Sequence, residues 1–146
     1  MSIVEKILLA VDGSDSCNKA VVKTNELAEK LNVEVTVLSV VERYMAPEIY
    51  SKSDAEKEIA EEKAIEKKGE EIVDSCINIF NNNKINIKRL VKKGRPAEVI
   101  CKVAEEGSYD LIIISDLGRN AVKKFLLGST TEKVVRHAKT SVLVVK

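Results

Sequence analysis

The sequence predicts an α/β protein built on a five-stranded parallel sheet. Short apolar runs rich in β-branched residues alternate with longer segments whose apolar residues recur at helical spacing. The resulting order is strand, helix, strand, helix, strand, helix, strand, loop, helix and strand. Strands that alternate with helices pair in parallel, and the helices cover both faces of the sheet.

Each predicted strand has its own signal. The first is continuously apolar and ends at a turn, as expected for a strand buried on both faces. The second is rich in β-branched residues. The third alternates apolar and polar residues and is therefore placed near an edge of the sheet. The fourth and fifth are short apolar runs. The five predicted strands are 7–11, 33–41, 85–91, 111–114 and 142–145.

Four helices are predicted between the strands. The second is long and charged, and Ser53 with Glu56 forms a capping-box pattern at its start. Pro96 suits the first position of the third helix, and Gly107 ends it. The charged block 54–71 is interpreted as a solvated helix face. The predicted helices are 15–31, 53–80, 97–106 and 129–138.

Composition limits the classes of function. The 146 residues suit a single domain spanning 1–146. A net charge of +1 and an aromatic content of 3% argue against nucleic-acid binding. No apolar run is long enough to span a membrane. The start of the chain lacks a secretion signal, and the three cysteines have no metal-ligand spacing, so we expect a cytoplasmic protein with buried thiols.

A candidate phosphate-binding loop follows the fourth predicted strand. Gly118 lies in this loop, and Gly128 stands immediately before Ser129 at the start of the last helix. Backbone N–H groups at a helix start lack partners within the helix and favour an anion. The turn at 12–14 follows the first strand. Ligands of parallel sheets bind at the carboxyl ends of strands, so we expect the two loops to meet in space.

The same residues also have a simpler interpretation. Ser129 and Glu132 stand three positions apart, as in a capping box. A capped helix start explains both residues without any ligand, and Gly128 is then only a turn residue. The residues alone leave the two interpretations open.

The chain resembles the universal stress protein family along nearly its whole length. The nucleotide-binding branch of that family shows glycine, two residues, glycine, nine residues, and then glycine with Ser or Thr. Gly118, the gap 119–127 and the pair Gly128-Ser129 match the last part of this motif. The other segments that carry the resemblance are 7–14, 37–42, 94–98, 109–114 and 141–145.

The resemblance implies a Rossmann-like three-layer fold of the adenine nucleotide alpha hydrolase type. It also implies an ATP-binding sensor or switch in the stress response, with slow hydrolysis at most and no assigned catalytic residue. The strand at 141–145 would form the edge through which a homodimer pairs. Protein partners are also expected, although the sequence does not identify them.

The resemblance assigns roles within the pocket. Gly118, Gly128, Ser129 and Thr130 would hold the ATP phosphates, and Asp12 would lie near the ribose and phosphates. The backbone around Val40 would meet the adenine, which Ala10 and Val11 would also border. Asp12 or Asp116 could take part in binding Mg²⁺. The full set of expected nucleotide-binding residues is Ala10, Val11, Asp12, Val40, Ser115, Gly118, Arg119, Gly128, Ser129, Thr130 and Thr131.

Two residues depart from the family motif. Ser115 replaces the first glycine, and serine would be sterically strained if this position needed a positive φ. Asp116 follows it, and a carboxylate there is expected to point away from a triphosphate, to hold Mg²⁺ or to weaken the site. A competing hypothesis is therefore a dimeric interaction module of the same fold that binds no nucleotide.

Overall fold

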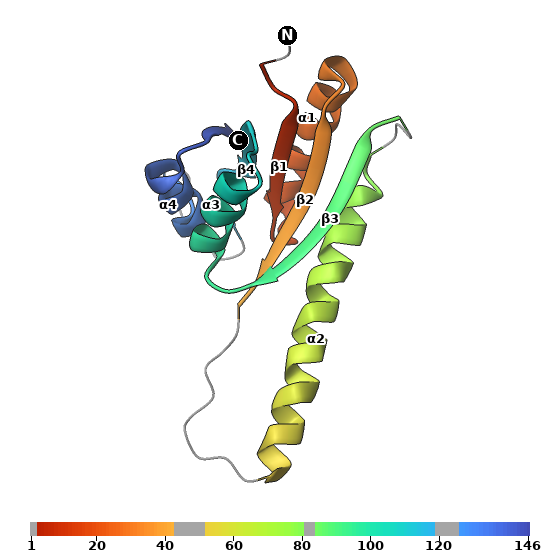
Figure 1. The fold of residues 1–146 in the computed structure, drawn as a ribbon, viewed down its shortest axis with the longest axis vertical. Coiled ribbons are helices and arrows are strands. Elements are labelled where there is room, and N and C mark those ends of the chain that lie inside the picture. Colours follow the sequence, from red (N-terminus) through yellow and green to blue (C-terminus); the bar gives the residue numbers. More distant parts are fainter. Residues whose placement is uncertain (1–2, 43–51, 81–83, 119–125) are drawn as a thin grey trace.

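The computed structural model describes residues 3–42, 52–80, 84–118 and 126–146. Five strands form one sheet in the order β3-β2-β1-β4-β5, and every neighbouring pair is parallel (Figure 1). The predicted α/β class and five-stranded sheet are confirmed. The strands are β1 (Lys6–Val11), β2 (Glu34–Val41), β3 (Asn86–Lys93), β4 (Leu111–Ser115) and β5 (Ser141–Val145), and the helices are α1 (Asp15–Leu31), α2 (Lys52–Ile77), α3 (Pro96–Glu106) and α4 (Ser129–His137).

The alternation of side chains along β1 divides the core into two halves. Ile7 and Leu9 point to the face that α1 and α2 cover, and both are fully buried. Leu8 and Ala10 point to the opposite face, where they pack with residues of α3 and α4. A strand in the middle of a three-layer sandwich needs apolar residues on both faces, which explains the continuous apolar run.

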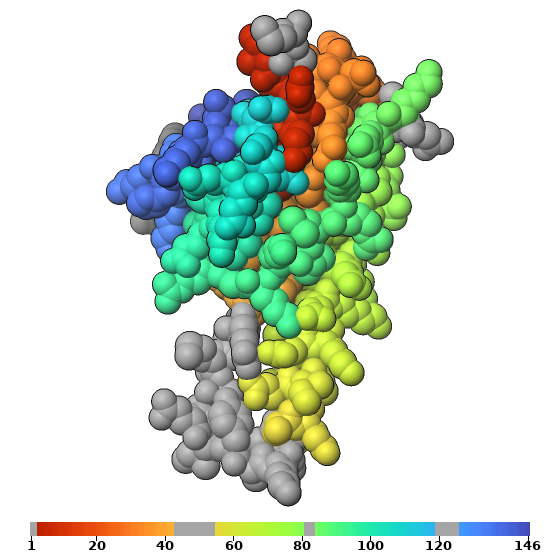
Figure 2. Space-filling view, in the orientation of Figure 1, coloured from red at the N-terminus to blue at the C-terminus, as the bar shows by residue number. Residues whose placement is uncertain are grey.

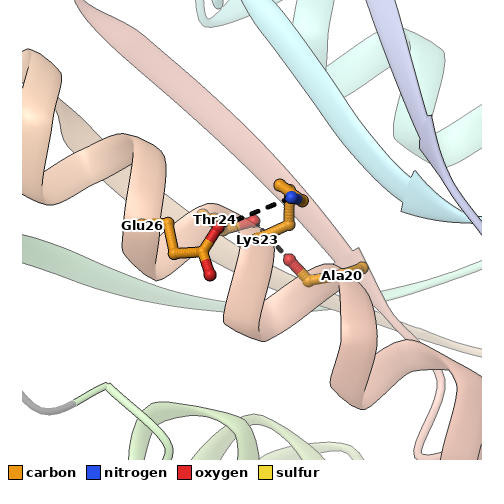
Figure 3. A network of polar contacts seen from close by, with 4 residues as sticks. All are labelled: Ala20, Lys23, Thr24 and Glu26. Carbon is orange, nitrogen blue, oxygen red and sulfur yellow. Dashed lines mark hydrogen bonds and ion pairs between the residues drawn. The ribbon is translucent and has the colours of Figure 1, made fainter.

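The first helix is capped at both ends by its own chain. Ser14 is the N-cap of α1, and its side chain accepts a hydrogen bond from the backbone N–H of Cys17. Asn32 ends the helix in the left-handed conformation with a φ of 53°. Inside α1, Thr24 is fully buried, and its hydroxyl donates to the carbonyl of Ala20 at 2.7 Å (Figure 3). The polar group is thereby satisfied within the apolar layer.

The second helix differs from its prediction at both ends. It begins at Lys52, so Ser53 lies inside the helix and is not the N-cap that the capping-box pattern predicted. Lysine has a high helix propensity, which allows the helix to include it. The helix ends at Ile77, and hydrogen bonds to carbonyls three residues back form a tight turn up to Phe80.

The N-terminal half of α2 extends past the carboxyl ends of the strands, whereas its C-terminal half packs on the sheet (Figures 1 and 2). Gly69 lies where the helix crosses the sheet. A Cβ atom placed there would lie 2.7 Å from Val91 Cγ1 and 2.8 Å from Val41 Cγ1. The helix therefore approaches β2 and β3 closely enough to exclude even a methyl group. Among the described helices, none has the length and apolar character that crossing a bilayer requires.

Candidate functional site

The loops after β1 and β4 meet at the carboxyl edge of the sheet. The chain adds β2 and β3 on one side of β1 and then places β4 and β5 on the other side, so the strand order reverses between β1 and β4. The hydroxyl of Ser16 donates to the carbonyl of Leu117 across this junction. The predicted meeting of the two loops is confirmed, and this is where ligands bind in open α/β sheets.

The loop after β1 holds a carboxylate in a fixed orientation. One oxygen of Asp12, Oδ1, accepts hydrogen bonds from the backbone N–H of Ser14 at 2.9 Å and from its hydroxyl. Gly13 has a φ of 79°, a conformation that favours glycine at this turn. The other oxygen, Oδ2, faces Gly118, because a Cβ on that glycine would lie 3.0 Å from it.

The two residues that depart from the family motif lie at the end of β4, where Ser115 is the last residue of the strand and Asp116 begins the loop. The hydroxyl of Ser115 donates to the carbonyl of Leu117 at 2.9 Å. The backbone of Ser115 does not adopt a positive φ, so the steric strain considered for serine at this position does not arise. The backbone N–H of Asp116 donates to the carbonyl of Val145 at 2.9 Å, which ties the loop to β5.

The start of α4 has no side-chain cap. Gly128 is the N-cap, and Ser129 is the first helical residue, so the predicted capping box of Ser129 and Glu132 is wrong. The motif is shifted by one position relative to the helix, and the cap position carries no side chain. The carboxylate of Glu132 instead pairs with Arg136 at 3.0 Å. The first N–H groups of α4 are therefore not capped by a side chain and can bind an anion.

Gly128 brings together the two arms of the β4–α4 connection, which are residues 116–118 after β4 and Gly128 before α4. Its N–H donates to the carbonyl of Asp116 at 2.7 Å. A Cβ at this position would lie 3.1 Å from the backbone nitrogen of Gly118. The φ of Gly128 is −57°, which any residue can adopt. Glycine is thus needed here for close approach of the backbone rather than for an unusual conformation.

A buried hydrogen bond anchors α4 to the sheet. Thr131 is only 3% exposed, and its hydroxyl donates to the carbonyl of Ser115 at 2.7 Å. This bond fixes the first turn of α4 against the carboxyl end of β4. The uncapped helix start is therefore held in place before any ligand arrives.

A cavity of about 660 Å³ opens between these loops. Its volume lies within the range typical of small-molecule sites. Most of the expected nucleotide-binding residues border it, whereas Asp116 is not among its lining residues, and Arg119 lies outside the described residues. The predicted residues that line the cavity are Ala10, Val11, Asp12, Val40, Ser115, Gly118, Gly128, Ser129, Thr130 and Thr131.

The structure adds lining residues that the sequence did not single out. Ile65, Lys68 and Ile72 of α2 border the cavity. Leu126 also lines the cavity although it is 63% exposed, which places an apolar side chain at the cavity mouth.

The donor set limits how a metal could be held. Within the described ranges, no three His, Cys, Asp or Glu residues gather in a way that could hold an ion. Asp12 contributes its carboxylate to the cavity wall, whereas the Asp116 side chain is not part of that wall. Mg²⁺ at this site would therefore take most of its oxygen ligands from a phosphate chain and from water, as is usual for this ion.

Two buried cysteines belong to the apolar cluster that α1 and α2 share. Interaction with Cys76 lowers the pKa of Cys17 to about 7, and the same interaction raises the pKa of Cys76. Burial opposes the shift of Cys17, whereas backbone hydrogen bonds from Asp12 and Gly13 support it. On the other face of the sheet, burial alone raises the pKa of Cys101.

Comparison with known proteins shows the family. The universal stress protein family matches residues 4–146. A putative universal stress protein of Staphylococcus haemolyticus is 30% identical over 149 residues, which cover 100% of this chain and 87% of the relative. The solved structure of the hypothetical protein MJ0577 is 28% identical with a TM-score of 0.83, covering 99% of this chain and 96% of its own.

A more distant structure shows the fold alone. A universal stress protein family protein from Arabidopsis thaliana, solved with AMP bound, is 22% identical with a TM-score of 0.63. The alignment covers 97% of this chain and 91% of the Arabidopsis chain. Together with the family match over nearly the whole length, these likenesses lead to one conclusion: the chain belongs to the universal stress protein family.

Proposed function

We propose that the cavity binds ATP and that the protein acts as a nucleotide-dependent sensor or switch. The observation that carries the proposal is the start of α4, where Ser129 and Thr130 line the cavity and no side chain caps the helix. Free N–H groups and the helix dipole favour a phosphate at such a point. The position where the strand order reverses supports the same assignment.

The phosphate chain is proposed to lie between the two glycine-bearing arms. Gly118 and Gly128 let the backbone approach closely, and the hydroxyls of Ser129 and Thr130 can donate to phosphate oxygens. The hydrogen bond from the Thr131 hydroxyl to the carbonyl of Ser115 holds the start of α4 against β4. Ser115 uses its hydroxyl within the loop, so its part is to shape the loop.

The adenine is proposed to lie at the carboxyl end of β2. The backbone around Val40 provides hydrogen-bonding groups, and Ala10 and Val11 form an apolar border. Ile65 and Ile72 add apolar surface from α2. A site with apolar walls and a few polar backbone groups is typical for a flat heterocyclic base.

Mg²⁺ is proposed to bind together with the phosphates, near Oδ2 of Asp12. The other oxygen of this carboxylate is occupied by Ser14, so Asp12 has one oxygen to offer. Such an ion would neutralise charge on the phosphates. Hydrolysis is expected to be slow at most, because the described lining residues include no histidine and no carboxylates other than Asp12 and Glu42 to serve as a general base.

We also propose a homodimer that forms through β5. This strand is at one end of the sheet order, and its outer edge is unpaired among the described strands. Edge strands of this kind pair readily with a second copy.

The AMP-bound relative from Arabidopsis belongs to the same family, which supports an adenine nucleotide as the ligand class.

A protein-interaction role without nucleotide is the second candidate. It is favoured by the exposed side chains of Leu126 and Leu127 at the cavity mouth, which are 63% and 38% exposed. Exposed apolar residues beside a cavity are common at sites of protein contact. In this case the cavity would bind a partner segment, and ATP would not compete.

The substitution Gly128→Val separates the two candidates. The Cβ would already lie 3.1 Å from the nitrogen of Gly118, and the branched side chain forces the arms apart. We expect ATP affinity, measured by isothermal titration calorimetry, to fall at least about tenfold. Lys133→Ala is the matched control, because Lys133 is exposed on α4 and does not line the cavity.

Circular dichroism and gel filtration accompany this titration. The helix content and the oligomeric state of Gly128→Val should equal those of the unmodified protein, because the change is confined to the loop. Equal ATP affinity in Gly128→Val and in Lys133→Ala would remove the phosphate-loop assignment.

A further inference from the structure

Two residues of opposite charge line the cavity at the carboxyl end of β2. Glu42 directly follows the last residue of this strand, and Lys68 belongs to α2, which runs past the same strand end (Figure 1). Their neighbours in the chain pack closely, because a Cβ on Gly69 would lie 2.8 Å from Cγ1 of Val41. This close approach fixes the helix against the strand end. Glu42 and Lys68 are therefore held on neighbouring walls of one cavity.

The face of α2 that carries Lys68 is turned to the cavity. Ile65, Lys68 and Ile72 are spaced three and four residues apart, as on one face of a helix, and all three border the cavity. The two side chains that flank Lys68 on this face are apolar, so neither can pair with its ammonium group. Glu66, two residues before Lys68, pairs instead with Lys93 of β3 at 2.6 Å.

The charges of Glu42 and Lys68 are available to a ligand. Among the described residues, neither side chain takes part in an ion pair or a hydrogen bond. Lys68 is the only cation among the described lining residues, and Glu42 is the only carboxylate besides Asp12. The β2 end of the cavity thus offers one hydrogen-bond acceptor and one donor, both charged.

We propose that Glu42 and Lys68 recognise the base of the bound nucleotide and select adenine. The inference rests on the proposed ATP site, because phosphates at the start of α4 leave the base at the β2 end. Strands β2 and β4 lie on either side of β1, about 10 Å apart at the usual strand spacing. The pair is therefore placed to contact the base rather than the terminal phosphates.

The chemistry of the pair matches the edge of adenine. The 6-amino group of adenine is a donor, and the ring nitrogens N1 and N7 on either side of it are acceptors. A carboxylate only accepts and an ammonium only donates. Glu42 accordingly accepts from the 6-amino group, and Lys68 donates to one of the two ring nitrogens.

Hypoxanthine, the base of ITP, should be discriminated against. It carries a carbonyl oxygen in place of the 6-amino group, so two acceptors would face each other at Glu42. Both side chains are exposed, and solvent weakens contacts of this kind. We therefore expect a value near the lower end of the range for reading one base edge, with ATP bound about fivefold to tenfold more tightly than ITP.

The test of Glu42 is the ratio of the Kd values for Mg-ITP and Mg-ATP, measured by isothermal titration calorimetry. The two ligands share the ribose and the triphosphate, so effects on the phosphate end cancel in the ratio. Glu42→Gln should bring the ratio close to one, because an amide donates as well as accepts. Glu70→Gln is the matched control, since Glu70 is exposed on α2 outside the cavity and its ratio should equal that of the unmodified protein.

The test of Lys68 uses Lys68→Met, which keeps an unbranched side chain and removes the charged donor. ATP affinity should fall about fivefold, whereas Lys67→Met, on the same helix but outside the cavity, should leave it unchanged. ATP analogues in which carbon replaces N1 or N7 locate the contact. One of the two should bind equally to Lys68→Met and to the unmodified protein, because the analogue already lacks the acceptor.

The outcomes separate this inference from the ATP site itself. Equal affinity of the unmodified protein for ATP and ITP, or an unchanged ratio in Glu42→Gln, would overturn the recognition of the base and leave the ATP site standing. The same loss for ATP and for both analogues in Lys68→Met would also overturn it. Failure of the unmodified protein to bind either nucleotide would overturn the ATP site and this inference together.

Discussion

Replacing Gly69 by alanine should destabilise the protein, although the same change stabilises most helices. In the interior of an exposed helix, alanine is favoured over glycine by about 1 kcal/mol. At Gly69, however, the added Cβ would lie 2.7 Å from Val91 and 2.8 Å from Val41. These methyl groups belong to β3 and β2, so the helix cannot relieve one contact by tilting toward the other strand.

The size of the effect follows from these contacts. An ordinary contact begins near 3.4 Å, so α2 must move outward or the valines must shift by about 0.6–0.7 Å. Val73 is fully buried on the same helix, and a gap of that size weakens its dispersion contacts by about a quarter to a half. Overpacking of this kind costs about 1–3 kcal/mol. After the gain of about 1 kcal/mol in helix propensity, we expect a net loss of up to about 2 kcal/mol.

Urea titration followed by far-UV circular dichroism measures the free energy of unfolding. Thermal melting should show a midpoint up to about 8 °C lower for Gly69→Ala. Lys67→Ala serves as the control, because its side chain is exposed on the same helix and its loss should change little. The double variant Gly69→Ala, Val91→Ala should be more stable than the sum of the single changes predicts. A gain of about 1 kcal/mol in Gly69→Ala would refute the close approach of α2 to the sheet.

Two further predictions concern hydrogen bonds that hold the edges of the fold. Thr131→Val removes the 2.7 Å bond to the carbonyl of Ser115, and urea titration should show a loss of about 1–3 kcal/mol; unchanged stability would exclude this bond as the anchor of α4. Asp110 accepts from the backbone N–H groups of Glu5 and Lys6, and these bonds lower its pKa below the ordinary value of 3.8. The ionised form is thus favoured in the folded state, so Asp110→Asn should be less stable at neutral pH. The difference should disappear as the pH falls through the lowered pKa, and a melting difference that persists in acid would contradict this.

The strands were predictable because the sheet is buried on both faces. Every residue of β1 after Lys6 is buried, which is why a continuous apolar run marked it. Alternation identified β3 as an edge strand, and the sheet order confirms this. The end of β3 was predicted too early, at residue 91. Parallel pairing with β2 continues to Lys93. The last two residues of β3 have polar side chains, so the apolar pattern did not include them in the strand.

The candidate site was only partly visible in the sequence. Glycines and hydroxyls marked the phosphate end, because that chemistry depends on neighbouring residues. The capping-box pattern at Ser129 was misleading, since a sequence motif does not tell which residue is the N-cap. Lys68 was missed because an exposed lysine on a charged helix carries no signal of its position near a cavity.

The apolar cluster that Cys17 and Cys76 share could not be inferred from the chain. Their separation in sequence is large, and three cysteines in an apolar context indicate only small buried side chains. Their place in one cluster depends on how α1 and α2 pack on the same face of the sheet. Long-range packing of this kind is set by the fold as a whole.

A calorimetric titration of Mg-ATP into protein stripped of any co-purified nucleotide tests the proposed ATP site most directly. We expect saturable binding of about one ATP per chain with a Kd in the micromolar range, which corresponds to a binding free energy near −8 kcal/mol. The absence of binding at millimolar ATP would contradict it. The cavity beside the uncapped start of α4 would then be assigned to a protein partner.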